Sequence, residues 1–455
     1  MNVTIFGLGI TGNALIEYFI GIKAKISISE KNIREKVLQN ILDTLKKYNI
    51  DAEFGGHSDK FICGADLIVV SPGVHLDIPP LELAKKNNIP IISEIELAYQ
   101  KLTKPIIAIT GTNGKTTTTT LVGEIIRNAG LNVAVAGNIG FPMIAVDDDN
   151  LDYIVAEISS YQLEATIKFK PKISAILNLA QDHLERHKTM ALYSKAKAKI
   201  FQNQDKNDYF VYNHDNDLVS ILAKDTSAVC IPFSRKYILK HGAFVDNGSI
   251  VYKDSNTEVI IRIDDIRIKG DHNIENALAC VAIAKLLGIK NEVIESTIKD
   301  FKGVEHRIEY VDTISGVAFI NDSKGTNTDS TVVALKTISN QYGLGKVILI
   351  AGGRDKGGDL ADFVNQIKES ARAVVLLGEA KERFRDALIK NSYVNYHIAD
   401  TFEDSIRKSF SLAGYGDVVL LSPACASFDM FSNYEERGDI FKNIVRKLKN
   451  ETAKI

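Results

Sequence analysis

The stretch KPIIAITGTNGKTTTTTLVGEII, residues 104–126, carries the strongest information on the fold. An apolar strand-like run leads into a short glycine loop, Gly111 to Thr116, and a helix-like run follows it. Glycines let successive backbone amides point at one centre, and a helix amino-terminus adds the positive end of its dipole. Lys115 is placed to reach β- and γ-phosphates, and the Thr116 hydroxyl is placed to ligate Mg²⁺. The common pattern has glycine where this chain has Ile109, so the sequence predicts a variant phosphate-binding loop.

Strand-like and helix-like segments alternate on both sides of this loop, which predicts an α/β protein with parallel sheets. A length of 455 residues favours about three domains at roughly 150 residues each. The first block holds strand-like runs that begin at VTIFG, and the second begins with the phosphate loop. Short runs of alternating polarity over residues 208–269 predict a small β element. After residue 302, five apolar runs separated by helical stretches predict a doubly wound unit.

Composition argues against several kinds of partner. The chain has 55 Lys and Arg against 57 Asp and Glu, a net charge of −2, so neither nucleic acid nor an anionic membrane is expected as a partner. The four cysteines are scattered without a CxxC pair, which argues against a zinc knuckle or a redox dithiol. No apolar run reaches the ~20 residues that span a bilayer, and no signal peptide is visible. We expect a soluble cytoplasmic protein.

A second glycine pattern, Gly7-x-Gly9-x-x-Gly12, follows the first strand, and Glu30 ends the second. This pattern is typical of dinucleotide-binding turns, with an acid on a ribose. On residues alone, three interpretations stay open: NAD binding, a turn without a ligand, or a turn that holds another nucleotide diphosphate.

Three further side chains are metal-site candidates downstream of the phosphate loop. Glu157 ends the run YIVAE, where a carboxylate is placed to hold Mg²⁺, although an ordinary strand-end acid fits equally well. His183 lies just beyond the next strand, close to the same expected sheet edge. The pattern around Lys197, with Lys195 and Lys199, by itself favours a solvated helix face.

In the last block, three loops of small and polar residues leave strand-like runs. These loops are residues 321–327, 352–357 and 422–427. Open α/β sheets bind ligands at the carboxyl ends of their strands, so we expect the three loops to form one site.

Several motifs together resemble one known family. They are GLGITG, GTNGKTT, the run from His272 to Ala279, Glu305-His306-Arg307, DSKGTN and SPACASFDMFSNYEERG. The chain is similar over its whole length to the Mur ligases of peptidoglycan synthesis, most of all to the members that add D-glutamate. The resemblance implies a Rossmann-like UDP-binding domain (residues 1–93), a central P-loop ATPase-like domain (94–302) and a Rossmann-like, doubly wound amino-acid-binding domain (303–455).

The resemblance also implies an activity. A monomeric enzyme of this kind uses ATP to join D-glutamate to UDP-N-acetylmuramoyl-L-alanine through an acyl phosphate. Its cofactors are ATP and Mg²⁺, and a lysine at the position of Lys197 is carbamylated. The implied catalytic residues are Lys115, His183 and Lys197.

The family's binding residues transfer position by position. The implied ATP contacts are Gly111, Thr112, Asn113, Gly114, Lys115, Thr116, Thr117, Asn273, Arg307 and Asp322. The implied Mg²⁺ ligands are Thr116, Glu157, His183 and carbamylated Lys197. The implied contacts to the UDP-sugar substrate are Ile10, Thr11, Glu30, Lys31, Asn32, Gly73, Asn138, Ser159 and Gln162. The implied D-glutamate contacts are Lys324, Thr326, Lys356, Ser427 and Tyr434.

Two features depart from what members of the family show: Glu30-Lys31-Asn32 does not repeat the Asp-Thr-Arg run typical of enterobacterial members, and Tyr434 stands where phenylalanine is frequent. Other functions stay as alternatives: a sister ligase that adds a diamino acid, a folylpolyglutamate synthetase, an NAD-dependent oxidoreductase, or a nucleotide-binding regulatory module. The absence of a DNPR-like loop argues against the first of these, and the glycine-rich first block argues against the second. The third leaves Lys115 without a role.

Overall fold

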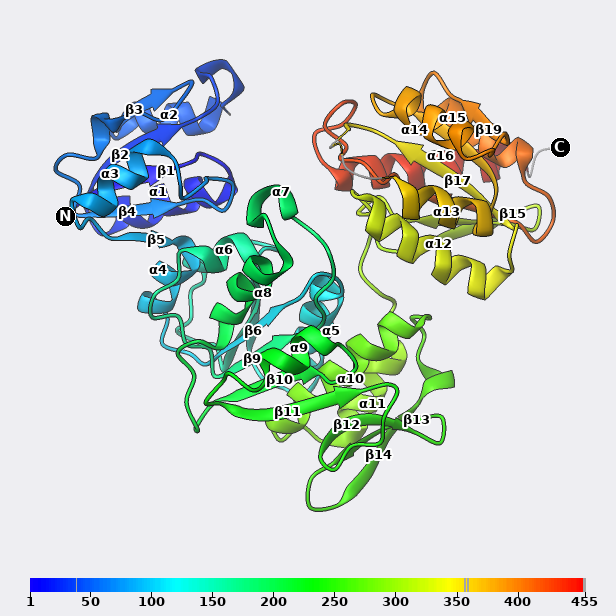
Figure 1. Ribbon diagram of the computed structural model, residues 1–455, viewed down its shortest axis with the longest axis horizontal. Helices are drawn as coiled ribbons and strands as arrows, with labels where there is room; N and C mark the ends of the chain where they lie inside the picture. The colour runs from blue at the N-terminus through cyan, green and yellow to red at the C-terminus, as the bar shows by residue number, and fades with distance from the viewer. Residues whose placement is uncertain (38, 356, 358–359, 453–455) are drawn as a thin grey trace. The chain divides into compact units, whose positions relative to one another are not determined.

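The computed structural model describes residues 1–37, 39–355, 357 and 360–452 (Figure 1). These residues form three sheets, and the chain divides into two compact units. The first unit holds Met1–Arg267 and Asp271–Phe301, and the second holds Ile268–Gly270 and the chain from Lys302 onward. Two of the three sheets belong to the first unit.

The first sheet has five parallel strands in the order β3-β2-β1-β4-β5, shown in blue tones in Figure 1. The strands are β1 (Asn2–Phe6), β2 (Lys25–Glu30), β3 (Asp51–Phe54), β4 (Leu67–Val70) and β5 (Ile91–Ser93). The helices that follow them are α1 (Ile10–Gly21), α2 (Gln39–Lys47), α3 (Pro79–Lys86) and α4 (Glu94–Lys101). The chain order reverses beside β1, and doubly wound sheets bind ligands at such a point.

The second sheet has nine strands in the order β14-β13-β12-β11-β10-β9-β6-β8-β7. The strands are β6 (Ile106–Thr110), β7 (Val133–Gly137), β8 (Tyr153–Glu157), β9 (Ile173–Ile176), β10 (Tyr209–Asn213), β11 (Val229–Ser234), β12 (Gly242–Asp246), β13 (Ser249–Lys253) and β14 (Thr257–Arg262). Its helices are α5 (Lys115–Asn128), α6 (Ser160–Glu164), α7 (Leu184–His187), α8 (Met190–Ala198), α9 (Asp217–Leu222), α10 (Asp271–Leu286) and α11 (Asn291–Asp300).

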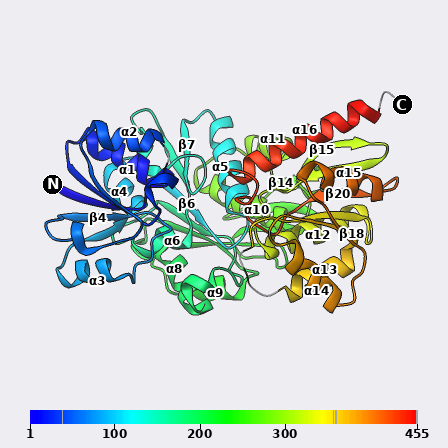
Figure 2. The same cartoon turned by 90° about the horizontal axis from the view of Figure 1, so that it is seen from above.

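The third sheet has the order β15-β16-β20-β17-β18-β19. The strands are β15 (Glu309–Ile314), β16 (Val317–Asn321), β17 (Val347–Gly352), β18 (Ala371–Leu377), β19 (Tyr396–Ile398) and β20 (Val418–Leu421). The helices are α12 (Thr328–Tyr342), α13 (Ala361–Ser370), α14 (Lys381–Lys390), α15 (Phe402–Leu412) and α16 (Tyr434–Thr452). Helix α16, the long red helix of Figure 2, packs against β15 and β16.

The expectation of parallel sheets is correct for the centres of the sheets and wrong at two edges. Strands β12, β13 and β14 pair antiparallel, and so do β15 and β16. Each of the hairpins β12–β13 and β15–β16 is closed by a turn with two consecutive positive φ angles, Asn247-Gly248 and Ser315-Gly316. Such turns match the twist of paired strands and allow a direct reversal of the chain.

Both faces of the third sheet are buried. Val347 and Leu349 face one hydrophobic cluster, while Ile348 and Ile350 face the other. This alternation follows from the two-residue period of a strand, and burial on both sides explains the continuous apolar run of β17.

The first two sheets share one hydrophobic core, which includes Phe19 of α1, Ile95 of α4 and Met143. Two buried acids of α4 add hydrogen bonds to the backbone of the segments around residues 144 and 167–169. Glu96 accepts hydrogen bonds from the backbone N–H groups of Ile167, Lys168 and Phe169 over 2.9–3.0 Å. Glu94 accepts from the N–H of Ile144 over 2.6 Å, and burial raises the pKa of Glu94 to about 7.

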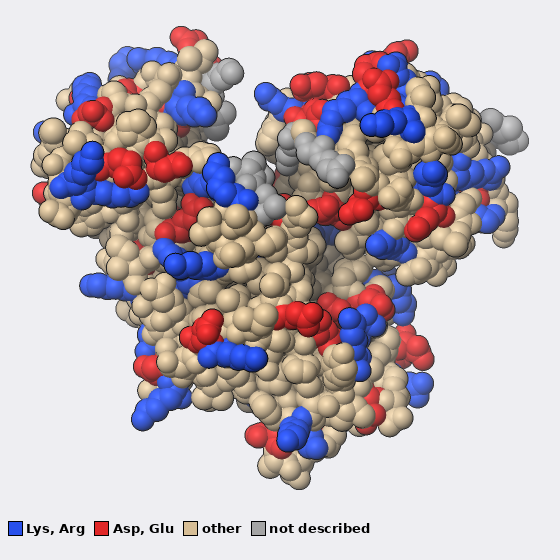
Figure 3. Space-filling view, viewed as in Figure 1, with Lys and Arg blue, Asp and Glu red and all other residues tan. Residues whose placement is uncertain are grey.

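On the face shown in Figure 3, basic and acidic side chains are interspersed rather than gathered by sign, in keeping with the net charge of −2. None of the helices in the described part of the chain is long and apolar enough to cross a membrane.

Candidate active site

The phosphate loop lies between β6 and α5, as the sequence predicts. Its backbone is held by Asn178, which follows β9: the N–H of Asn113 donates to Oδ1 of Asn178 over 2.8 Å, and Nδ2 of Asn178 donates to the carbonyl of Asn113 over 3.1 Å. The N–H of Thr112 donates to the carbonyl of Asn178 over 3.0 Å. These bonds within the protein fix the loop conformation, which suits an anion-binding site.

Glycine is strongly favoured at position 114, directly before α5. Its φ of +83° lies in the left-handed region, and a Cβ atom there would collide with Oδ1 of Asn276. Asn276 is buried on α10, where its Oδ1 also accepts from Thr118 over 3.2 Å and its Nδ2 donates to Oδ1 of Asn273 over 3.2 Å. Asn273, an expected ATP contact, is thereby linked to the start of α5.

Lys115, Thr116 and Thr117 form the first turn of α5. Nζ of Lys115 folds back over the loop and donates to the carbonyls of Gly111 (2.9 Å) and Thr112 (2.8 Å). The amine therefore lies over the loop whose amides would hold phosphates.

Glu157 lies at the end of β8, next to the phosphate loop. In the sheet register it pairs with Ile109, two residues before Gly111. Oε1 of Glu157 accepts from Nδ2 of Asn138 over 2.7 Å, and Oε2 is buried with no hydrogen-bond partner among the described residues. A buried carboxylate oxygen without a partner is costly, and a cation would relieve that cost. Mg²⁺ is commonly held by one or two carboxylates together with waters and phosphates, so this position fits the ion.

Lys197 is buried, with 1% of its surface exposed, and not on a solvated helix face as its pattern alone would predict. Its Nζ donates to the carbonyl of Gly111 over 2.9 Å and to Oγ1 of Thr110 over 3.2 Å. Burial, reinforced by the positive charge of Lys115, lowers the pKa of Lys197 well below its ordinary value. A neutral amine is the form that reacts with CO₂, so this environment suits carbamylation.

His183 has a φ of +54°, in the left-handed region that non-glycine residues rarely adopt. Its Nδ1 hydrogen-bonds the hydroxyl of Tyr161 over 2.9 Å. Tyr193 is nearby, with its ring centroid 6.4 Å from that of His183, and its hydroxyl hydrogen-bonds Oγ1 of Thr112 over 3.1 Å. Nζ of Lys197 lies 4.9 Å from the Tyr193 ring. Tyr193 thus connects the phosphate loop to the helix that carries Lys197.

In the first sheet, the glycine turn is closed by Glu30. The N–H of Leu8 donates to Oε2 of Glu30 over 2.5 Å, and the N–H of Asn32 donates to Oε1 over 2.6 Å. Gly12 is needed because a Cβ there would collide with the carbonyl of Gly7. The buried Glu30 carboxylate therefore shapes the turn, a role the sequence pattern did not predict.

The other expected UDP-substrate residues of this sheet surround that turn. Ile10 begins α1 with 79% of its surface exposed, and Thr11 follows it. Lys31 and Asn32 are exposed after β2, and Gly73 lies in the turn that follows β4. All these positions follow the carboxyl ends of adjacent strands.

Ser159 and Gln162 form the capping box of α6: Oγ of Ser159 accepts from the N–H of Gln162 over 3.3 Å, and Oε1 of Gln162 accepts from the N–H of Ser159 over 2.9 Å. The pair therefore fixes the start of α6, directly after β8.

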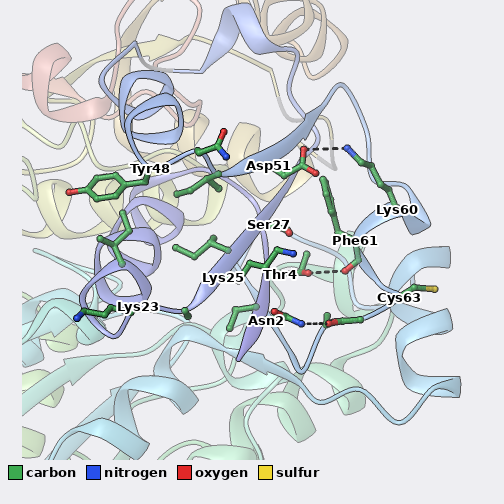
Figure 4. Close-up of a pocket in the computed structure, with 18 residues that line it drawn as sticks. Asn2, Thr4, Lys23, Lys25, Ser27, Tyr48, Asp51, Lys60, Phe61 and Cys63 are labelled. Atoms are coloured by element: carbon green, nitrogen blue, oxygen red, sulfur yellow. Dashed lines mark hydrogen bonds and ion pairs between the residues drawn. The ribbon is translucent and has the colours of Figure 1, made fainter.

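A cavity of about 680 Å³ lies in the first sheet, but at the opposite end from the glycine turn (Figure 4). Asn2, Lys25 and Asp51, which begin β1, β2 and β3, line it together with Tyr48 and Lys60. The cavity does not contain the expected UDP-substrate residues.

In the second unit, the three predicted loops leave the neighbouring parallel strands β16, β20 and β17, and hydrogen bonds connect them. Oγ of Ser422 donates to Oδ2 of Asp322 over 2.7 Å, and Arg354 bridges to Ala426 through the backbone. Burial raises the pKa of Asp322 to about 6, although the hydrogen bond from Ser422 and the nearby charge of Arg307 oppose the shift. The expectation that these loops share one sheet edge is confirmed.

Arg437 of α16 joins two of these loops and is 1% exposed. Its Nε donates to Oγ of Ser323 (3.0 Å), its Nη2 to the carbonyl of Ser323 (2.7 Å), and both Nη atoms to the carbonyl of Cys425 (3.2 Å). Burial lowers its pKa to about 10.

Four of the expected D-glutamate residues lie at this edge. Nζ of Lys324 is 5.2 Å from the ring centroid of Tyr434, and Thr326 lies two residues further along the same loop. Ser427 is buried in the loop after β20. Lys356 lies outside the described residues.

The sequence interpretation missed several residues that hold the site together: Asn178, Asn276, Tyr161, Tyr193, Arg186 and Arg437. Their side chains contact loop backbones or other candidate residues. A single sequence gives such contacts no signal, except that Asn276 and Arg437 fall inside the motifs that carry the family resemblance.

A glycine phosphate loop in the middle of a mainly parallel sheet, in a chain with two further doubly wound sheets, defines a multidomain α/β nucleotide-binding protein. Three family models match along the chain: "Mur ligase MurD-like, N-terminal domain" over residues 1–93, "Mur ligase middle domain" over 109–284, and "Mur ligase, glutamate ligase domain" over 306–425. The chain belongs to the Mur ligase family.

Similar proteins cover nearly the full length. The chain is 46% identical to the UDP-N-acetylmuramoylalanine--D-glutamate ligase of Thermoanaerobacter sp. (strain X514), with 98% of each chain covered. It is 43% identical to the protein of the same name from Geotalea uraniireducens, with 98% of this chain and 97% of that protein covered. Among solved structures, MurC from Thermotoga maritima matches with a TM-score of 0.62 at 21% identity, over 99% of this chain and 100% of that one. This last likeness shows the fold alone.

Proposed function

We propose that the chain joins D-glutamate to UDP-N-acetylmuramoyl-L-alanine, with hydrolysis of ATP to ADP and phosphate. The observation that carries this proposal is end-to-end similarity, at 46% identity, to a ligase with that name, combined with a preformed phosphate loop. In this proposal the chain is a cytoplasmic monomer, and its domains are residues 1–93, 94–302 and 303–455.

Mur ligases use ATP and Mg²⁺. In the proposed site, residues Gly111 to Thr117 hold the phosphates, with Asn273, Arg307 and Asp322 as further ATP contacts. The proposed Mg²⁺ ligands are oxygens of Thr116, Glu157 and carbamylated Lys197, together with a ring nitrogen of His183. When bound, Mg²⁺ supplies charge neutralisation for phosphoryl transfer.

The glycine turn of the first sheet binds the uridine diphosphate end of the substrate. This turn and the neighbouring loops follow the carboxyl ends of the strands, where open α/β sheets bind ligands. Ile10, Thr11, Lys31 and Asn32 contact this end, and Glu30 shapes the turn. The contacts further along the sugar come from the remaining residues, which are Gly73, Asn138, Ser159 and Gln162.

The amine substrate is assigned to the loops of the third sheet. Lys324, Lys356, Thr326, Ser427 and Tyr434 supply cationic and hydroxyl groups. These groups suit a dicarboxylate amino acid, because a carboxylate in a closed cleft requires charged or hydrogen-bonding partners.

The reaction has two steps. An oxygen of the L-alanyl carboxylate attacks the γ-phosphorus, and the bond to the β-phosphate oxygen breaks, which forms an acyl phosphate and ADP. The D-glutamate amine then attacks the acyl carbon, loses a proton, and expels phosphate as the amide forms. Lys115 stabilises the charge that develops on the transferred phosphoryl group.

The test is ADP release by the purified chain with ATP, Mg²⁺ and UDP-N-acetylmuramoyl-L-alanine. D-Glu, L-Glu, L-Lys, meso-diaminopimelate and D-Ala-D-Ala are offered in turn, and the amide product is identified by mass spectrometry. Only D-Glu should stimulate release and yield product. Stimulation by another amine instead, or amide formation without ATP, would refute the proposal.

A further inference from the structure

Arg186 of α7 is an almost buried cation, with 8% of its side chain exposed, three residues after His183. Its Nη2 donates to the carbonyl of Val74 over 2.8 Å, and its Nε donates to both carboxylate oxygens of Glu164 over 3.2 Å. Arg186 therefore joins the loop after β4, in the first sheet, to helix α6 on the second.

The Val74 end of this contact leads to the glycine turn. The N–H of Val74 donates to the carbonyl of Ser71 over 3.0 Å and so closes the turn that contains Gly73. Oγ of Ser71 donates to the carbonyl of Gly7 over 3.1 Å. A continuous chain of hydrogen bonds thus runs from Arg186 to the start of the glycine turn.

The Glu164 end leads to α6. Glu164 is the last residue of this helix. The pair Ser159 and Gln162 forms the capping box at the start of the same helix. His187, the neighbour of Arg186, reinforces the attachment, since its Nε2 hydrogen-bonds Oγ of Ser160 over 3.0 Å and its Nδ1 lies 3.4 Å from Oε1 of Glu164.

A third branch leads to His183. The guanidinium of Arg186 lies 5.0 Å from the centroid of the Tyr161 ring, and the hydroxyl of Tyr161 hydrogen-bonds Nδ1 of His183 over 2.9 Å. The phosphate loop is held by a different side chain, Asn178, so we expect changes at Arg186 to affect the UDP-sugar substrate more than ATP.

We propose that Arg186 is a positioning residue for the UDP-sugar substrate: it holds the loop of Gly73, helix α6 and His183 in one mutual geometry. This inference rests on the proposed function, because Gly73 and the pair Ser159 and Gln162 at the start of α6 are proposed contacts of that substrate, whereas His183 is a proposed Mg²⁺ ligand. A guanidinium suits the task because its planar fork of N–H donors serves a carboxylate and a carbonyl at once. An ammonium at this place cannot keep both geometries.

The test compares Arg186→Met and Arg186→Lys with the wild type. The matched control is Arg407→Met, which removes another carboxylate-bridging arginine, one paired with Glu403 and Glu451 and outside the proposed site. The KM values for UDP-N-acetylmuramoyl-L-alanine and for ATP are measured separately, and binding of the UDP substrate without ATP is measured by calorimetry. Circular dichroism reports folding.

We expect Arg186→Met to raise the KM and the Kd for the UDP substrate by about tenfold or more, with the KM for ATP changed by less than about twofold. Arg186→Lys should restore only part of this loss, and Arg407→Met should resemble the wild type. An equal rise in both KM values, or no rise for the UDP substrate, overturns the inference. If Arg186→Met fails to fold, Arg186→Lys and Glu164→Gln decide by the same two measurements. Failure of the proposed function is distinct, because the wild type would then show no D-Glu-dependent ADP release.

Discussion

Asn138 and Glu157 share one hydrogen bond of 2.7 Å, from the amide Nδ2 to the carboxylate Oε1, which leaves Oε2 of Glu157 buried beside the phosphate loop. Asn138 orients the carboxylate, and Oε2 stays available for a cation. The side chains expected for the UDP substrate and for Mg²⁺ are therefore in direct contact.

Replacing this carboxylate should separate activity from stability. Glu157→Gln keeps the shape and one acceptor but removes the charge that would hold Mg²⁺, so kcat should fall by roughly 10²-fold or more. The melting temperature should stay the same or rise, because a buried carboxylate with one oxygen lacking a hydrogen-bond partner among the described residues costs free energy. Glu258→Gln, which changes a half-buried acid paired with Lys285, serves as the control. A variant that keeps its activity would exclude Glu157 as a magnesium ligand.

Lys197 should carry a carbamate. After equilibration with ¹³C-bicarbonate, the wild type should show a carbamate carbonyl signal by NMR, and Lys197→Met should lack it. Lys197→Ala should lose roughly 10²-fold or more in kcat, with partial recovery on addition of short-chain carboxylates that replace the lost ligand. Full activity of the alanine variant, with no such signal in the wild type, would leave Lys197 as a structural amine.

Two glycines with nearly the same φ offer a controlled test of the phosphate loop. Gly114 (φ +83°) faces Oδ1 of Asn276, whereas at Gly130 (φ +82°) an added Cβ would meet no described atom within 4 Å. Both alanine variants should lose roughly 1–2 kcal/mol from the left-handed backbone. Only Gly114→Ala should also raise the KM for ATP, by about tenfold or more, since the loop must shift. Equal ATP kinetics in the two variants would show that the loop tolerates the collision.

Glu94 predicts a pH dependence of stability. Its pKa of about 7 in the folded protein exceeds the ordinary value of 4.5, so the native state binds more protons between these values. Stability therefore falls as the pH rises from 4.5 to 7, by on the order of 3 kcal/mol, and the loss is complete above pH 7. Glu94→Gln cannot ionise, so its melting temperature relative to the wild type should be higher at pH 8 than at pH 5. The opposite sign would show that burial does not control this carboxyl.

Much of the fold follows from local patterns in the sequence. The apolar runs and the glycine loop predict the parallel strands β1, β4, β6, β8, β9 and β16 to within a few residues, because a strand buried on both faces is mostly apolar. Strand β2, KISISE, was predicted as well, although it alternates apolar and polar residues. The edge strands β3, β7 and β15 were missed. The segments DAEF and EYVDTI mix polar and apolar residues, and VAVAG is a short run of small side chains. The hairpin that turns at Asn247-Gly248 lies within the predicted β element of residues 208–269.

The site was predictable where chemistry is local and unpredictable where it depends on tertiary contacts. The strand–loop–helix context of Lys115 is visible in the sequence. The burial of Lys197 is not, because the charges around it in the sequence suggest a solvated helix, and only packing of α8 against the phosphate loop removes it from water. The hydrogen bonds of Arg186 span 112 and 22 residues, distances over which no periodicity carries information.

The two acids of α4 have a practical consequence for the design of truncated proteins. Glu94 and Glu96 cap backbone N–H groups of residues 144 and 167–169, so a recombinant fragment that begins at the phosphate-loop strand would leave those donors without acceptors. A stand-alone central fragment should therefore begin no later than β5. Shorter pieces are expected to aggregate or to require the missing peptide in trans.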